Sequence, residues 1–374
     1  MLLRNGVFGA LICALLFVTA VGPTWSEEEA EKTGARAANV QKLSFGQGKD
    51  FSEIGVVEAF AAYAGEKRDY AYLMGVSGGA FRIAWFAGPA QPGAPVVWCP
   101  SSCAISPECV QGNALAAIGY TLTPMENKPL DDTWTAIVES MQTCTPIVSH
   151  GLVGAPEFCL IVGFEEEGKA RRLLVRSYFD KGEEYSKIDF KEFKTVWDSS
   201  NYLGLIEKLE SRPKEEDLVV QSLKRAVAFF DAGKTQEMWV CGSAAYAAWA
   251  DALKSPVAEK DAGNAAWVNA WQTHILIDAR KAAAAYLTSL KDRPELAEAA
   301  KRFEKETEIL KEIQTLLPFS WDKDMAAAMN DAAKPMLDEK NRARAAEIVL
   351  KALEEDKAAI QMIRDCLKKL ESGK

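Results

Sequence analysis

The sequence predicts an α+β fold in which a mixed domain containing strands is followed by a helical domain. Residues 40–205 hold most of the glycines and several runs rich in β-formers, whereas residues 213–372 are dominated by Ala, Glu, Lys and Leu. The polar segment between them, "EKLESRPKEED", contains Pro213 and is typical of a join between domains. The length of 374 residues is sufficient for two domains, which we expect at 45–212 and 213–374.

The first residues predict a secretory signal peptide over 1–26. A single early cation, Arg4, precedes an apolar run from Val7 to Val21, and small and turn-forming residues follow. That run is shorter than the roughly 20 residues that a membrane-spanning helix needs, which favours a cleaved signal over an anchor. We therefore expect a flexible linker over 27–44 and an exported protein, periplasmic or extracellular, that has no membrane span after signal removal.

Composition argues against several kinds of partner. The formal net charge is −9, and loss of Arg4 with the signal makes it one unit more negative. A nucleic-acid partner requires a concentrated basic surface, so we expect none. The histidines outside the signal, His150 and His274, are far apart, and no clustered carboxylates accompany them, so we expect no metal site. Aromatic residues in the helical half recur at core spacing, and we expect no cofactor.

Periodicity predicts the elements of the first domain. Residues 51–65 have the apolar spacing of a helix that stops at Gly65. Asp132 can cap a helix over 133–141, and a short strand begins at 146–148. The continuous apolar run 158–164 fits a buried strand, with 171–179 as its hairpin partner across an acidic turn at 165–169.

The second domain reads as successive amphipathic helices. Apolar residues recur at helical spacing, and Gly233, Pro294 and Pro318 supply stop and start signals. The expected helices cover residues 215–233, 243–255, 263–292, 294–317 and 338–370. This pattern predicts a helical bundle.

The stretch "YLMGVSGGAFRIAW" (72–85) spells GxSxG, the pattern of the serine-hydrolase nucleophile elbow, with Ser77 as nucleophile. That elbow requires a strand before the serine, here "DYAYLMGV", and a helix after it, here "AFRIAWF". It also requires several preceding strands, for which the chain before Ser77 is too short. We keep a serine esterase, with His150 or His274 as base, as a minor alternative and interpret the glycines as a structural turn.

The cysteines suggest disulfides, because an exported chain matures in an oxidising compartment. Cys99, Cys103, Cys109 and Cys144 are the candidates, with connectivity left open. A zinc site is the rival interpretation, but the CxxC spacings of zinc sites are absent. Cys13 lies in the signal, which leaves an odd number of cysteines, and we expect Cys159 and Cys366 to be inert thiols.

The order of these elements, with the segments "DYAYLMGVSGGAFRIAW", "GLVGAPEFCLIVGFEEEG", "CGSAAYAAWADAL" and "ARKAAAAYL", resembles the papain-like fold of bacteriocin-processing cysteine peptidases. More closely, it is similar to the family of butirosin-biosynthesis protein H. The resemblance covers roughly residues 45–290 and implies a papain-like α+β domain followed by a helical domain.

The same resemblance implies which positions would carry catalysis. The nucleophilic cysteine of those peptidases starts the first helix, and the matching residue here is Ser52. Their histidine base lies six residues before the glycine of the buried strand, and the matching residue is Glu157. A serine without a neighbouring imidazole is not activated for attack, and a carboxylate of ordinary pKa is a poor base for it.

We therefore expect a non-catalytic binding or interaction protein with a small-molecule or peptide ligand in an interdomain cleft. The expected cleft residues are Ser77, Arg82, His150, Glu157 and Tyr178. Arg82 would hold a carboxylate, or else form an ordinary surface ion pair, and His150 is also compatible with a purely structural loop role. The alternative is an acyl or amide transferase or hydrolase of the same family that uses another cleft residue, because protein H is understood as an acyltransferase.

Overall fold

The computed structural model describes residues 32–86, 109–126, 128–200, 202–235, 239–290 and 293–372. The predicted signal peptide, Cys99 and Cys103 lie outside the described residues. The chain forms two compact units: unit 1 comprises residues 1–43 and 123–206, and unit 2 comprises 44–122 and 207–374. The second crossing lies close to the expected domain boundary at 212. Residues 44–122, however, group with the C-terminal helices.

An antiparallel sheet frames unit 1. Its strands follow the order β3–β8–β4–β5–β6–β7, and β1 also pairs with β5. Two of these strands, β3 and β8, carry the chain from one unit to the other. Their bounds are β1 Lys32–Arg36, β3 Tyr120–Met125, β4 Ile147–His150, β5 Phe158–Glu167, β6 Ala170–Arg176, β7 Ser186–Asp189 and β8 Leu203–Lys208.

The predicted hairpin is confirmed as β5 and β6, which turn at Gly168 with a φ of +58°. Two helices, α4 (Leu130–Gln142) and α5 (Phe190–Ser200), contribute to the core cluster of this unit with Trp134 and Trp197, which pack with strand residues such as Ile161. The predicted helix and short strand are thus confirmed as α4 and β4. The cap differs from the expectation, because α4 begins after Pro129 rather than at Asp132.

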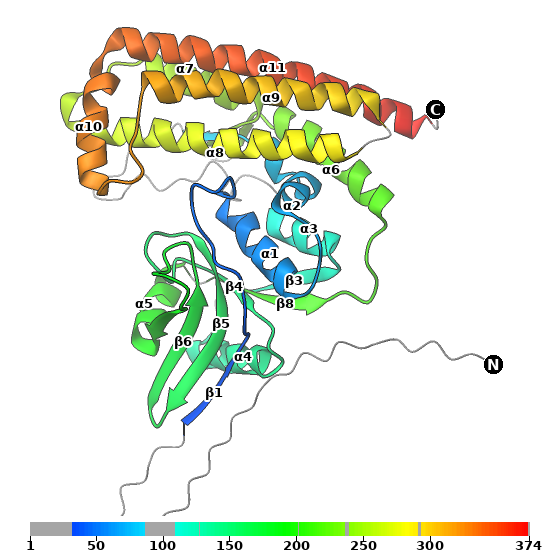
Figure 1. The fold of residues 1–374 in the computed structure, drawn as a ribbon, viewed down its shortest axis with the longest axis vertical. Helices are drawn as coiled ribbons and strands as arrows, with labels where there is room; N and C mark the ends of the chain where they lie inside the picture. Colours follow the sequence, from blue (N-terminus) through cyan, green and yellow to red (C-terminus); the bar gives the residue numbers. More distant parts are fainter. Residues whose placement is uncertain are drawn as a thin grey trace, which may run out of the picture. The chain divides into compact units, whose positions relative to one another are not determined.

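Unit 2 contains the helical bundle, so the α+β prediction of a sheet region followed by helices is confirmed. Figure 1 shows α8, α9 and α11 running lengthwise beside one another, with α10 across their ends. The helices of this unit are α1 Ser52–Tyr63, α2 Tyr70–Ser77, α3 Val110–Ala117, α6 Glu215–Asp231, α7 Ser243–Lys254, α8 Ala262–Ser289, α9 Pro294–Leu316, α10 Met325–Leu337 and α11 Glu339–Glu371, with 3₁₀ turns η1 Gly79–Phe81 and η3 Glu259–Asp261.

Each C-terminal helix expected from periodicity is present, and α10 is an addition. Asp324 caps α10 by accepting from the amides of Ala326 and Ala327. Three short strands also pair in unit 2: β2 Ala84–Phe86, β9 Lys234–Thr235 and β10 Trp239–Cys241. Here Trp85 of β2 stacks on Trp249 of α7 at 6.1 Å between ring centroids, which joins this small sheet to the bundle.

Candidate functional site

The GxSxG segment does not form a nucleophile elbow. The expected strand before Ser77 is the helix α2, and the expected helix after it is the turn η1 followed by strand β2. Asp69 caps α2 by accepting from the Tyr72 amide at 2.8 Å, and Gly78 ends it with a φ of +87°. These start and stop signals outweigh the strand-like composition, so the secondary structure assumed for the esterase reading is wrong.

Ser77 is enclosed by its own turn. Its side chain has 0% exposure, and its hydroxyl donates to the Met74 carbonyl at 3.2 Å while accepting from the Gly79 amide at 3.3 Å. The nearby Gly75 lets α2 approach α8, because a Cβ there would lie 1.9 Å from the Tyr286 ring. The glycines therefore serve packing, and Ser77 presents no hydroxyl to solvent.

Ser52 and Arg82, the other two candidates in unit 2, are also buried. Ser52 is the first residue of α1 and is 3% exposed, on a helix buried continuously from Ser52 to Ala61. Arg82 is 7% exposed, lies 3.9 Å from the Glu53 carboxylate and covers the Phe229 ring at 5.6 Å. Its ion pair is therefore buried, whereas the sequence suggested a surface pair or a ligand contact.

The remaining candidates, His150, Glu157 and Tyr178, lie in unit 1. The Gly151 amide donates to the Glu157 carbonyl at 2.9 Å, which brings both ends of the loop between β4 and β5 together. The His150 ring packs edge-on against Phe158, and burial lowers the pKa of its imidazole. Tyr178 is buried at 8% exposure. His150 thus has the environment of a structural histidine.

Among the described cysteines, Cys109, Cys159 and Cys366 carry free thiols, so the expected pairing of Cys109 is wrong. Its Sγ accepts a hydrogen bond from the Gly112 amide, so this sulfur caps the start of α3. Burial raises the pKa of Cys159 to about 12 and also raises that of Cys366, in agreement with the expectation of inert thiols. Pairing of Cys144 with Cys99 or Cys103 stays a prediction.

A histidine–carboxylate pair that the sequence interpretation missed lies in unit 2. His274 of α8 contacts Asp50, just before α1, with 2.8 Å between Nε2 and Oδ2. The Asp50 side chain is 2% exposed and that of His274 is 23% exposed. The pair therefore has a buried acid and a partly accessible imidazole, an arrangement that fixes the ring and its tautomer.

A second carboxylate lies behind this pair. Asp278, one turn after His274 on α8, accepts from the Tyr70 hydroxyl at 2.5 Å and from the Asp50 amide at 3.3 Å. Burial raises the pKa of Asp278 to about 6, and the negative charge of Asp50 acts in the same direction. Asp50 and Asp278 are here called the buried carboxylate pair.

Aromatic rings lie beside His274. Trp271 stacks on the imidazole with 6.1 Å between centroids, and Trp321 lies 5.6 Å from it. Phe45 packs against Trp271, and Phe319 packs against Trp321. Trp321 is 42% exposed, which is unusual for so large an apolar side chain. We call Phe45, Trp271, His274, Phe319 and Trp321 the aromatic cluster.

This arrangement limits the chemistry available. Because the Asp50 carboxylate accepts from Nε2–H, a neutral His274 carries its lone pair on Nδ1, where it can accept a proton or a hydrogen bond. No hydroxyl or thiol is hydrogen-bonded to His274 within the described part of the chain. In that same part, no three His, Cys, Asp or Glu side chains are arranged to hold a metal ion.

Part of this site can be recognised from the sequence. Trp271, His274 and Asp278 follow the i, i+3, i+7 spacing of one helical face within "WQTHILID". Sequence alone placed His274 in the expected helix 263–292 and did not connect it with Asp50. Asp50 lies 224 residues away, and nothing in its local sequence indicates that it meets α8.

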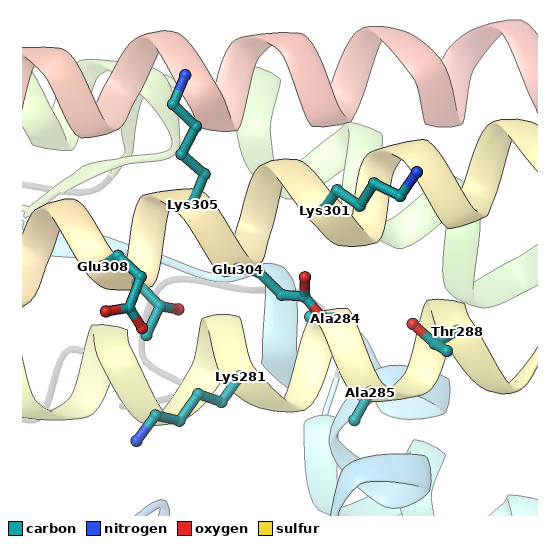
Figure 2. A pocket seen from close by; sticks show the side chains of 9 residues that line it. Lys281, Ala284, Ala285, Thr288, Lys301, Glu304, Lys305 and Glu308 are labelled. Carbon is teal, nitrogen blue, oxygen red and sulfur yellow. The ribbon is translucent and has the colours of Figure 1, made fainter.

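A groove between α8 and α9 is a second surface feature (Figure 2). It has a volume of about 950 Å³, and its lining includes Ala284 and Ala285. Two of its lysines are engaged elsewhere, since Lys301 pairs with Glu298 and Lys305 with Glu355 of α11. The groove therefore gathers ordinary surface ion pairs rather than groups directed at one point.

Comparisons with known proteins leave the family open, because neither protein-family models nor curated proteins match this chain. Within the described ranges, none of the helices combines the length and apolar character needed to cross a bilayer.

Proposed function

We propose that this chain is a binding or interaction protein on a papain-like framework that lacks the catalytic pair, with its ligand site at the aromatic cluster. The observation that carries the proposal is the burial of both candidate nucleophiles, since Ser52 is 3% exposed and Ser77 is 0% exposed. A nucleophile must reach its substrate, and neither serine does. The buried start of α1 and the β5–β6 hairpin support the papain-like relationship.

The proposal includes export to the periplasm or the extracellular space. The cation, apolar run and small residues at the start of the chain support it.

A second candidate function is hydrolysis, or acyl or amide transfer, with His274 as general base. The 2.8 Å contact with Asp50 favours it, because an oriented imidazole with an available Nδ1 can activate a water molecule or an acceptor. This candidate requires turnover that depends on His274 and needs neither Ser52 nor Ser77.

Covalent labelling and turnover separate the two functions. The intact protein is incubated with an alkyl fluorophosphonate and its mass is measured, and release of nitrophenol from p-nitrophenyl acetate is followed in parallel. We expect no adduct, and a rate equal to that of the H274Q variant. A stoichiometric adduct mapped to Ser52 or Ser77 would overturn the proposal, and turnover lost in H274Q would establish the second candidate.

A further inference from the structure

We infer that the aromatic cluster of unit 2 binds a guanidinium group, stacked on Trp321 and hydrogen-bonded to His274. The inference rests on the proposed binding function and names its ligand chemistry. Three features of the described residues carry it: a buried carboxylate pair whose basic contact is an imidazole, an exposed tryptophan and available hydrogen-bond acceptors.

The negative charge comes from the buried carboxylate pair. Asp50 and Asp278 are 2% and 4% exposed. In the described part of the chain, His274 is the one basic side chain in ion-pair contact with either of them. The neighbouring Lys49 is bound to Glu58 at 2.7 Å. A cation bound beside this imidazole would add a favourable charge next to the two buried acids.

The indole face comes from Trp321. Other aromatic rings of this chain already carry guanidinium groups: Arg68 lies 4.1 Å from the centroid of Tyr72, and Arg176 lies 4.3 Å from that of Tyr185. Trp321, 42% exposed, receives no cation from the described residues. Tryptophan binds cations best among the aromatic residues, and a planar guanidinium can stack on it.

Two hydrogen-bond acceptors near Trp321 are the third feature. Nδ1 of the neutral His274 ring has a lone pair and no hydrogen-bond partner among the described residues. Asp322, next to Trp321, is exposed and forms no ion pair with any described residue, whereas its neighbour Lys323 is paired with Asp331. A guanidinium has five N–H donors in one plane, so it can meet a ring and two acceptors together.

The test uses two ligands of nearly the same shape, one with a charged guanidinium and one with a neutral urea. The ¹⁵N-labelled full chain is titrated with N-acetyl-arginine amide or N-acetyl-citrulline amide, in which a neutral urea replaces the guanidinium, and the indole Nε1–H resonances are followed. We expect saturable shifts of the Trp321 and Trp271 resonances with the arginine derivative. Citrulline should bind about tenfold more weakly, a difference that lies within the range of a cation–π contribution.

Two variants locate the site, and a third is the control. W321L should weaken arginine binding about tenfold and D322N about threefold, whereas F179L, which removes an exposed ring of unit 1, should leave it unchanged. Because Asp322 is exposed, D322N serves even if W321L unfolds. Agmatine and an arginine-containing tripeptide distinguish a free guanidine from a peptide as the source: equal affinity supports the first, and tighter tripeptide binding supports the second.

Each failure has its own signature. Equal affinity for arginine and citrulline, both lost in W321L, would overturn guanidinium recognition and leave the binding function standing. Arginine binding that persists unchanged in W321L and D322N would overturn the assigned site. An adduct at Ser52 or Ser77 would overturn the binding function itself, whatever the titrations show.

Discussion

Arg280 of α8 and Asp356 of α11 form an ion pair of 2.7 Å with exposures of 0% and 1%. The same guanidinium contacts Glu306 of α9 at 3.2 Å and donates to the carbonyl of Ala80 in η1 at 2.8 Å. The Tyr246 hydroxyl contacts both acids. Burial raises the pKa of Glu306 to about 8, so a protonated Glu306 leaves one cation and one anion in the network.

Replacing Arg280 with methionine should destabilise the protein by about 3–5 kcal/mol, because Asp356 would then be a buried charge without a countercharge. The measurement is the free energy of unfolding in urea at pH 7. The control is R344M, since Arg344 forms an exposed pair with Glu347 on α11 and its loss should cost less than about 0.5 kcal/mol. A cost below about 1 kcal/mol for R280M would contradict the prediction.

The wild type should lose stability relative to D278N as the pH rises from 4 to 8. The folded protein binds the Asp278 proton more tightly than the unfolded chain does, since the pKa is about 6 instead of 3.8. The stability gained from this tighter proton binding amounts to roughly 3 kcal/mol. It is fully present below pH 4 and is lost as the pH rises through 6. Asparagine retains an acceptor for the Tyr70 hydroxyl without titrating.

Urea midpoints at intervals between pH 4 and pH 8 check this prediction, with D322N as an exposed control whose profile should follow the wild type. Parallel curves for wild type and D278N would show that Asp278 has an ordinary pKa.

G75A should destabilise the protein by more than about 3 kcal/mol, because the added methyl would overlap the Tyr286 ring at 1.9 Å. The comparison is G112A in α3, where the new Cβ would lie at an ordinary 3.5 Å from Cys109. Removing a helical glycine there should be neutral or stabilising by up to about 1 kcal/mol. Similar thermal midpoints for the two variants would refute close α2–α8 packing.

Q272M should stabilise the protein by about 1 kcal/mol. Gln272 of α8 is 0% exposed, and neither atom of its amide has a hydrogen-bond partner among the described residues. A methionine of similar shape removes the cost of that unpaired group. The exposed Q361M on α11 is the control and should change the unfolding free energy by less than about 0.5 kcal/mol. Destabilisation by Q272M would indicate that the amide is satisfied after all.

Sequence periodicity was enough for the elements that obey simple rules. The β5–β6 hairpin and the long helices α8, α9 and α11 follow from apolar spacing and from Gly and Pro signals. It was not enough for α2, where aromatic and β-branched residues suggested a strand although Asp69 and Gly78 cap a helix. The capping residues therefore make this segment helical, and Gly75 allows the helix to pack against Tyr286.

The candidate site required knowledge of distant contacts. Trp271, His274 and Asp278 share a helical face that the sequence displays, yet Asp50 and Trp321 join them from other segments. Asp50 is 224 positions away from His274, so no periodic spacing in the sequence connects the two. For the same reason Ser52, Ser77 and Arg82 looked available in the sequence, whereas tertiary packing buries all three.

The assignment of residues 44–122 and 207–374 to one unit sets the order in which this protein can mature during synthesis. The helix α2 leaves the ribosome early, but α8, its main packing partner, emerges only about half a chain later. In the interval, residues 123–206 can complete the sheet of unit 1, whose pairings are closer in sequence. The nascent α2 segment therefore lacks its main packing partner until α8 appears.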